Sequence, residues 1–288
     1  MKVSFSTISC PEATLSQIAA MGEQGGFAGV ELRSFGVAGS TIASEPFLTD
    51  AAKLRRIMTN AGLSVTCIAT GLAFDRAIDP ALGRTFLDTE QAVRGAKHAI
   101  ELAAQIECPL VRVFGFELLP TESRKNGITR ILEQFNKALD ACDRMGVKLV
   151  LENGGSFCTA EQLCEFMDAA DNVLLGAAYS VAVGQQAGDD VQTAIRTLGK
   201  RLLTIKVRDL ADGVQVRLGE GTVQNYQAIH AARSIGFAGP VVYELDRVWD
   251  PSGIERDQVQ GWLNHASQTM HRWVSGAVRE VPHAHAMA

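Results

Sequence analysis

Several features that would direct a functional interpretation are missing from this 288-residue sequence. Lys and Arg form no run and the net charge is −5, which argues against a surface for nucleic acid or anionic membrane. No window approaches about 18 uninterrupted apolar residues, the length expected of a membrane-spanning helix. The N-terminal residues, MKVSFSTISCPEA, lack the basic and apolar regions of a secretory signal. We therefore expect a soluble cytoplasmic protein that binds neither nucleic acid nor membrane.

Cysteine is sparse and carries no recognisable motif. The six cysteines form no CxxC pair, and most of them lie within apolar strand or helix patterns. A free cysteine in such a pattern behaves as a small buried hydrophobe. We therefore expect free thiols in place of a disulfide framework.

Short β-branched runs alternate with longer helical patterns along the whole chain. We predict strands over Lys2–Ser6, Gly29–Leu32, Ser64–Ala69, Leu110–Phe114, Val147–Glu152, Val173–Ala178, Leu203–Arg208 and Val241–Leu245. We predict helices over Leu15–Gly25, Asp50–Ala61, Gly83–Glu107, Arg124–Met145, Ala160–Ala170, Val191–Leu198, Thr222–Ser234 and Glu255–Val274, and a turn at Asp209–Gly213. Eight such βα repeats without a Pro/Gly/Ser-rich linker predict a single α/β domain, a (β/α)8 TIM barrel over residues 1–276. Residues 277–288 lack periodicity and are predicted to be a loose tail.

A doubly wound sheet is the main alternative to the barrel. It would normally place a glycine-rich phosphate loop after the first strand. The corresponding segment, SFSTISCPEAT, contains no glycine. The sequence therefore favours the barrel.

Charged and amide residues stand at the carboxyl ends of several predicted strands, where the active site of such a barrel forms. They are Glu31, Arg33, Arg112, Glu152, Asn153, Lys206, Arg208 and Glu244. A buried charge costs much free energy unless it is paired or used in function. Side chains alternate along a strand, so Glu31 and Arg33 share a face, as do Lys206 and Arg208. We predict that these residues line the barrel mouth, while a purely salt-bridged role stays open for each. For Arg112, an anion clamp and a strut to Glu31 or Glu152 are both open.

Four segments carry a resemblance to a known family. In their order and spacing, GFAGVELR, LVLENGG, LTIKVRDLADG and LGEGTVQNYQAIHAARSIGFAGPVVYEL resemble the xylose isomerase-like barrels, the sugar-phosphate isomerase/epimerase group. Metal-dependent members of that group hold a divalent ion with a strand-five Glu, a strand-six Asp, a strand-seven His and a strand-eight Glu. In its epimerases and isomerases, the two glutamates also move a proton beside a carbonyl. The resemblance places Glu152 and Glu244 at these two positions and implies a small polyhydroxy carbonyl substrate.

The sequence departs from the family pattern between the two glutamates. The sixth strand offers only Tyr179 or Ser180 at the position of the Asp, and Lys206 stands at the position of the His. All six histidines lie in helical patterns or in the tail. A protonated lysine has no lone pair for a metal and repels a cation. We therefore expect no high-affinity metal and no other cofactor, while weak binding of Mg²⁺, Mn²⁺ or Zn²⁺ to Glu152 and Glu244 stays open.

The leading hypothesis is a sugar or sugar-acid isomerase or epimerase. Glu152 and Glu244 would be its catalytic proton-transfer pair, and Lys206 would supply the charge of the metal. The predicted substrate-binding residues are Glu31, Arg33, Arg112, Asn153 and Arg208. A Schiff base on Lys206 is disfavoured, because two glutamates raise the pKa of its ammonium.

Two other functions stay open. A dehydratase would use the same proton abstraction, followed by loss of hydroxide. A ligand-binding relative without catalytic activity would keep the Glu–Lys–Glu bridge as the remnant of a lost metal site. The sequence also leaves a homo-oligomer open.

Overall fold

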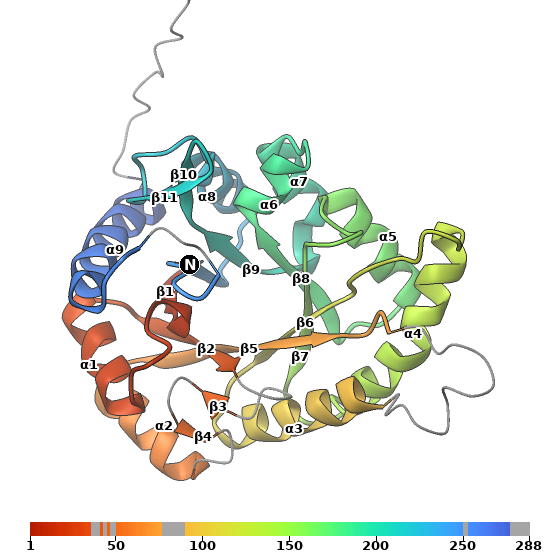
Figure 1. Cartoon of the computed structure of the whole chain (residues 1–288), viewed down its shortest axis with the longest axis horizontal. Helices are drawn as coiled ribbons and strands as arrows, with labels where there is room; N and C mark the ends of the chain where they lie inside the picture. The colour runs from red at the N-terminus through yellow and green to blue at the C-terminus, as the bar shows by residue number, and fades with distance from the viewer. Residues whose placement is uncertain (36–40, 43–44, 47–49, 77–89, 250–252, 277–288) are drawn as a thin grey trace, which may run out of the picture.

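The computed structural model describes residues 1–35, 41–42, 45–46, 50–76, 90–249 and 253–276. At its centre is a ring of parallel strands: β1 (Lys2–Ser6), β2 (Gly29–Phe35), β5 (Ser64–Ala73), β6 (Leu110–Phe114), β7 (Lys148–Glu152), β8 (Leu175–Ser180), β9 (Leu202–Val207) and β12 (Pro240–Tyr243). Strand β1 pairs with both β12 and β2, so the sheet closes on itself (Figure 1). The (β/α)8 barrel predicted from the sequence is confirmed.

Helices surround the strands (Figure 1). They are α1 (Leu15–Gly25), α2 (Ala51–Asn60), α3 (Gln91–Gln105), α4 (Arg124–Asp140), α5 (Ala160–Ala170), α6 (Val181–Gln186), α7 (Val191–Leu198), α8 (Asn225–Ser234) and α9 (Val259–Ser275). Their buried faces pack against the outward side chains of the strands, which leaves the inward side chains for the barrel interior. No helix within the described ranges is long and apolar enough to cross a bilayer.

Local sequence signals explain where helices begin and end. Thr14 and Thr159 each form a capping box at the start of α1 and α5, with Gln17 and Gln162 as the reciprocal partners. Helix α1 ends at Gly26, whose φ of 69° lies in the left-handed region that favours glycine. These caps fix the points at which the chain turns back toward the barrel.

Two local features differ from the sequence prediction. Helix α6 was not predicted, because its residues, VAVGQQ, directly continue a buried strand. The predicted turn at Asp209–Gly213 is wrong in part, because Asp209–Ala211 is a strand (β10) that pairs with β11 (Val214–Val216). The turn of this hairpin lies at Asp212 and Gly213, which both have positive φ, as a two-residue hairpin turn requires.

The short strands β3 (Thr41–Ile42) and β4 (Glu45–Pro46) add to the sheet beside β2. All six cysteines are free thiols, as predicted. Residues 83–89 of one predicted helix and the tail at 277–288 lie outside the described residues.

Candidate active site

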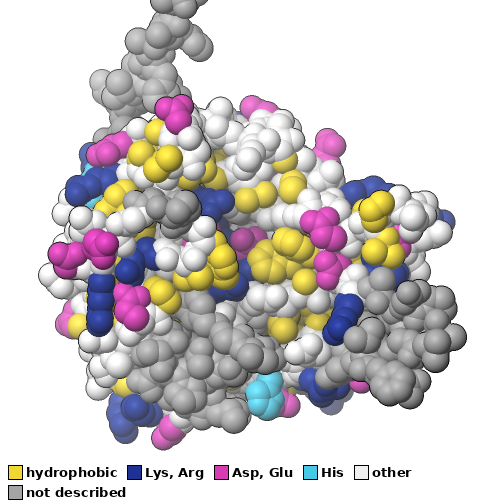
Figure 2. Space-filling view, in the orientation of Figure 1, with side chains coloured by type: hydrophobic (Ala, Val, Ile, Leu, Met, Phe, Trp, Pro, Cys, Tyr) yellow, Lys and Arg dark blue, Asp and Glu magenta, His cyan; other side chains and the backbone are white. Residues whose placement is uncertain are grey.

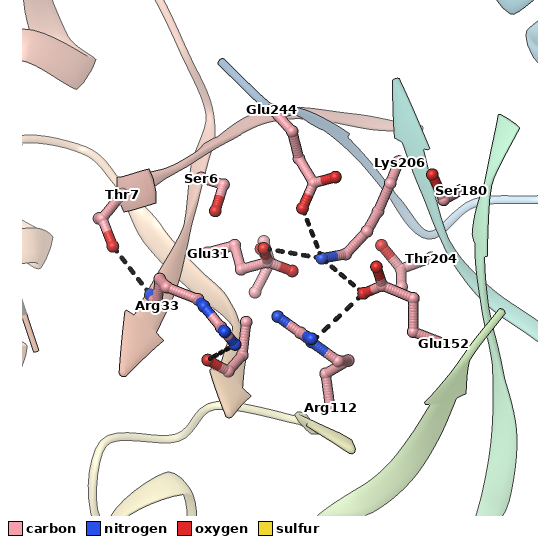
Figure 3. A network of polar contacts seen from close by, with 12 residues as sticks. Ser6, Thr7, Glu31, Arg33, Arg112, Glu152, Ser180, Thr204, Lys206 and Glu244 are labelled. Carbon is pink, nitrogen blue, oxygen red and sulfur yellow. Dashed lines mark hydrogen bonds and ion pairs between the residues drawn. The ribbon is translucent and has the colours of Figure 1, made fainter. Parts of the chain in front are cut away.

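Lys206 lies inside the barrel, with carboxylates on several sides of its ammonium (Figure 3). Its Nζ is 3.1 Å from Glu31 Oε1, 2.8 Å from Glu152 Oε2 and 2.7 Å from Glu244 Oε1. Lys206 Nζ donates hydrogen bonds to Glu31 and Glu244. The contact with Glu152 is an ion pair without hydrogen-bond geometry. We call these four residues the Lys206 cluster.

Strand register explains why residues so far apart in sequence meet. Lys206 on β9 pairs with Val242 on β12, so Glu244 lies two residues further on the same inward face. Lys206 also pairs with Ser180 at the end of β8, and Glu152 is the last residue of β7. The sequence predicted Glu31 as a substrate contact. The structure adds that Glu31 is a third carboxylate of the cluster.

The pKa of Lys206 is raised above its usual value. Burial by itself would lower this pKa, but the charges of Glu152, Glu244 and Glu31 outweigh the effect of burial. Lys206 is therefore held as an ammonium. The raised pKa of Lys206 agrees with the argument against a Schiff base, because formation of a Schiff base requires a neutral amine.

The two glutamates of the predicted proton-transfer pair have pKa values shifted in opposite directions. Burial raises the pKa of Glu152, but Arg112 and Lys206 outweigh burial and lower it overall. Burial also raises the pKa of Glu244, and there the negative neighbours add to burial, so that Lys206 does not reverse the shift. Glu152 is held ionised, while Glu244 takes up a proton more readily. Opposite shifts in adjacent carboxyl groups are the pattern of an acid–base pair.

Two arginines predicted as substrate contacts also reach the site (Figure 3). Arg112 Nε lies 3.2 Å from Glu152 Oε2, so Arg112 forms the strut to Glu152 that was one of its two predicted roles. Arg33 Nη1 donates to the carbonyl of Ala69 at 3.2 Å, and its guanidinium carbon lies 5.2 Å from the ring centroid of Trp249. In the space-filling view, basic and acidic side chains meet among hydrophobic ones near the centre of the face (Figure 2).

The side chain of Asn153, which the sequence predicted as a substrate contact, forms hydrogen bonds with backbone groups. Its Oδ1 accepts from the N–H of Ser180 at 2.6 Å, and its Nδ2 donates to the carbonyls of Cys158 and Ser180. Asn153 is 2% exposed, so water does not compete for these bonds. Asn153 therefore joins the carboxyl ends of β7 and β8, and its contact with substrate stays a prediction.

We expect Asn153→Ala to lower the free energy of unfolding by about 1–3 kcal/mol, because it leaves a buried N–H and two carbonyls without their partner. Denaturation in urea measures this loss. Asn172→Ala is a suitable comparison, since the Asn172 side chain accepts from the N–H of Leu174 on a more exposed segment. An Asn153→Ala variant as stable as wild type would contradict the assigned role.

Arg208 is half-buried, and its carbonyl accepts from Asn225 Nδ2 at 2.9 Å. Its guanidinium Nε is buried without a hydrogen-bond partner within the described part of the chain. The predicted contact with substrate stays a prediction for this residue.

Sequence reasoning missed a polar contribution from β1. Ser6 pairs in register with Glu31, and both are fully buried. Ser6 Oγ and Glu31 Oε2 each lack a hydrogen-bond partner among the described residues. The alternation of Ser4 and Ser6 with apolar residues in KVSFS was the available signal for an inward polar face. Two unpartnered polar atoms at one place mark this end of the barrel as polar, in contrast to the apolar packing around it.

The residues present do not fit the divalent ion that the family resemblance implies. Lys206 Nζ lies within 3.1 Å of an oxygen of each of three carboxylates, where a cation shared by them would lie. Strand β8 ends in Ser180 where the family has an aspartate. No group of three or more His, Cys, Asp and Glu residues with a geometry for metal binding occurs within the described ranges. We therefore assign no step to a metal.

The sequence matches the family model of the xylose isomerase-like TIM barrel over residues 18–265. The chain belongs to this family. No curated protein matches the sequence. Family membership confirms the resemblance on which the positions of Glu152 and Glu244 rest.

Solved structures resemble the chain along nearly its whole length. An L-ribulose 3-epimerase has a TM-score of 0.78 at 17% identity, covering 96% of this chain and 95% of its own. The IOLI protein with a bound zinc atom has a TM-score of 0.76 at 17% identity, with 97% and 100% covered. The probable 3-DHS dehydratase AsbF of Bacillus anthracis has a TM-score of 0.74 at 15% identity, with 94% and 99% covered. At these identities the likeness establishes the fold.

Proposed function

We propose that this protein is an isomerase or epimerase that transfers a proton at the carbon beside a carbonyl of a small polyhydroxy compound. The observation that carries the proposal is the Lys206 cluster. It places two glutamates with oppositely shifted pKa values within 2.8 Å of one buried ammonium. Proton abstraction beside a carbonyl needs a base, an acid and a positive charge at the carbonyl oxygen, and the cluster contains all three.

Each residue has a distinct role in the proposed reaction. Glu152, which is ionised, removes the proton from the carbon. Glu244, whose pKa is raised, takes up a proton more readily and returns it to the opposite face of that carbon in an epimerase, or to the neighbouring carbon in an isomerase. The turnover leaves Glu152 protonated and Glu244 ionised, and exchange with solvent restores the pair.

Lys206 stabilises the negative charge that develops on the carbonyl oxygen. Two of its three N–H groups are hydrogen-bonded to Glu31 and Glu244. Glu152 Oε2 lies 2.8 Å from the same Nζ, and in the proposed reaction the third N–H turns from Glu152 to the substrate oxygen. In this proposal the ammonium takes the place of the divalent ion of related enzymes, and the reaction requires no metal.

The comparisons support this class of reaction. Similar structures include an L-ribulose 3-epimerase and a D-psicose 3-epimerase in the presence of D-fructose. A sugar or sugar acid is accordingly the proposed partner. The similarity to a probable dehydratase keeps loss of water as the second candidate reaction.

Solvent deuterium exchange tests the proposal directly. Wild-type protein is incubated in D₂O with a panel of ketoses and keto sugar acids, and deuterium beside the carbonyl is measured by NMR and mass spectrometry. We expect enzyme-dependent incorporation into at least one compound, together with a new stereoisomer or positional isomer. Glu133→Gln, a change on the exposed face of α4, is the matched control and should keep full activity. A product that has lost water would indicate the dehydratase, and no incorporation into any compound would contradict both reactions.

A further inference from the structure

Among the described residues, Arg33 is a buried cation without a carboxylate partner. It is 8% exposed, and its side chain donates to one backbone carbonyl, that of Ala69. Within the described ranges, no carboxylate lies within ion-pair distance of its guanidinium. The three carboxylates of the site contact Lys206 and Arg112 instead. Burial of a guanidinium without an opposite charge beside it costs free energy, and an anionic ligand would compensate this cost.

A second guanidinium lies next to Arg33. Figure 3 shows the Arg33 and Arg112 head groups side by side and directed into the same region of the barrel. Burial lowers the pKa of Arg33 to about 10, and the positive charge of Arg112 adds to this effect. Arg33 remains charged at neutral pH, so the two cations repel each other. An anion between them would remove this repulsion.

Trp249 makes a cation–π contact with the Arg33 guanidinium. The ring centroid lies 5.2 Å from the guanidinium carbon, and 62% of the tryptophan is exposed. A contact of this kind stabilises the guanidinium without using its N–H groups. Those N–H groups match the two oxygens of a carboxylate, which arginine binds in a planar, bidentate manner.

We propose that the substrate is a hydroxy acid, such as a sugar acid, whose carboxylate is bound by Arg33 together with Arg112. This inference rests on the proposed function, since it names the substrate class of the same site. Arg33 follows Glu31 by two residues on the inward face of β2, so the anion lies next to the Lys206 cluster. In a sugar acid the carboxylate is close to the reacting carbons, whereas a phosphate ester usually stands at the far end of the chain. Phosphate groups in this fold commonly bind at the loops after the seventh and eighth strands, which here are β9 and β12.

Pairs of ligands that differ in the acid group test the proposal. The probes are D-ribonate against ribitol and D-gluconate against D-glucitol, with inorganic phosphate and ribose 5-phosphate as further arms, each titrated calorimetrically into the full-length protein. We expect wild type to bind each acid at least about tenfold more tightly than its alditol. Arg33→Gln should abolish this preference while leaving the alditol affinity unchanged. Arg33→Lys should keep part of the preference.

Arg196→Gln is the matched control, because Arg196 lies on the exposed face of α7 and contacts Gln192. It should keep the full preference for acids. Equal binding of acid and alditol by wild type, or no binding of either acid, would overturn the proposal. A preference kept by Arg33→Gln would do so too, and tighter binding of ribose 5-phosphate would replace the carboxylate with a phosphate. If Arg33→Gln does not fold, the wild-type comparison and Arg33→Lys still decide the question.

The binding readout does not depend on catalysis, so the two proposals fail separately. Tight acid binding without deuterium exchange into any compound would refute the proposed reaction and support the carboxylate site. Exchange confined to neutral ketoses would support the proposed reaction and refute the carboxylate site.

Discussion

Replacing Lys206 with methionine is expected to lower the free energy of unfolding by about 3–5 kcal/mol at neutral pH. The change leaves Glu31, Glu152 and Glu244 buried without the ammonium that contacts all three. A loss of this size corresponds to a fall in melting temperature on the order of 10 °C. Thermal and urea denaturation measure the effect. Lys200→Met, on an exposed segment, is the matched control and should change stability little.

The pH dependence of this variant provides a second readout. Without Lys206, burial and mutual repulsion raise the pKa of the glutamates above their values in the unfolded chain. Such groups contribute stability at low pH that is lost as the pH rises through the folded-state pKa. The deficit relative to wild type should therefore grow between about pH 5 and about pH 8. Adding Glu31→Gln to the variant removes one of the repelling charges and should recover part of the loss.

The same variant tests whether Lys206 takes the place of a metal. Three carboxylates without an ammonium between them offer oxygen ligands to a divalent ion. Millimolar Mn²⁺ or Mg²⁺ should raise the melting temperature of Lys206→Met and leave that of wild type nearly unchanged. Equal stabilisation of both proteins would show that Lys206 does not occupy the place of the ion.

Glu152→Gln and Glu244→Gln are each expected to reduce formation of the isomeric product by about 10²–10⁴-fold, because each removes one proton-transfer group. The two variants should differ in hydrogen exchange. Glu152→Gln loses the group that removes the substrate proton, so the unreacted substrate should gain no deuterium. Glu244→Gln keeps that group and should place deuterium in recovered substrate without forming product.

Both glutamine variants must be shown to fold. For Glu244→Gln, the direction in which its stability relative to wild type changes with pH can also be predicted. The pKa of Glu244 is raised in the folded protein, chiefly by burial. Wild type therefore loses the contribution of Glu244 to stability as the pH rises through this pKa, whereas glutamine does not titrate. The stability of Glu244→Gln relative to wild type should increase with pH. Identical exchange patterns in Glu152→Gln and Glu244→Gln would contradict the assigned base and acid.

The sequence was sufficient to predict which charged residues face the barrel interior. Apolar strands that end in a charge, together with the alternation of side chains, bring Glu31, Arg33, Arg112, Glu152, Lys206 and Glu244 into one site. The bridge from Lys206 to Glu152 and Glu244 and the strut from Arg112 to Glu152 were among the predicted contacts. The contact of Glu31 with Lys206 was not predicted, because it depends on the stagger between strands. A register shift between Val30 and Glu31, where β2 pairs with β5, is one such feature that carries no sequence signal.

Two features that the sequence did not reveal, the backbone hydrogen bonds of Asn153 and helix α6, have the same physical origin. Asn153 looked like a substrate contact because it follows Glu152 at a strand end. In the structure its side chain hydrogen-bonds to backbone groups of Cys158 and Ser180, which come within reach only when β7 and β8 are paired. Helix α6 was not predicted because its helical state depends on tertiary packing, which overrides the β-branched composition of its first turn.

The Lys206 cluster also constrains how the barrel is assembled. Its hydrogen bond from Lys206 to Glu31 joins residues separated by 175 positions, and that from Lys206 to Glu244 joins residues separated by 38. Contacts between distant parts of a chain form late in folding, because a long loop must close first. In a nascent chain that has not yet been extended to Glu244, the ammonium of Lys206 would lack the Glu244 carboxylate as a partner. The four charges thus make closure of the ring cooperative, since the first and last quarters of the chain neutralise the same ammonium.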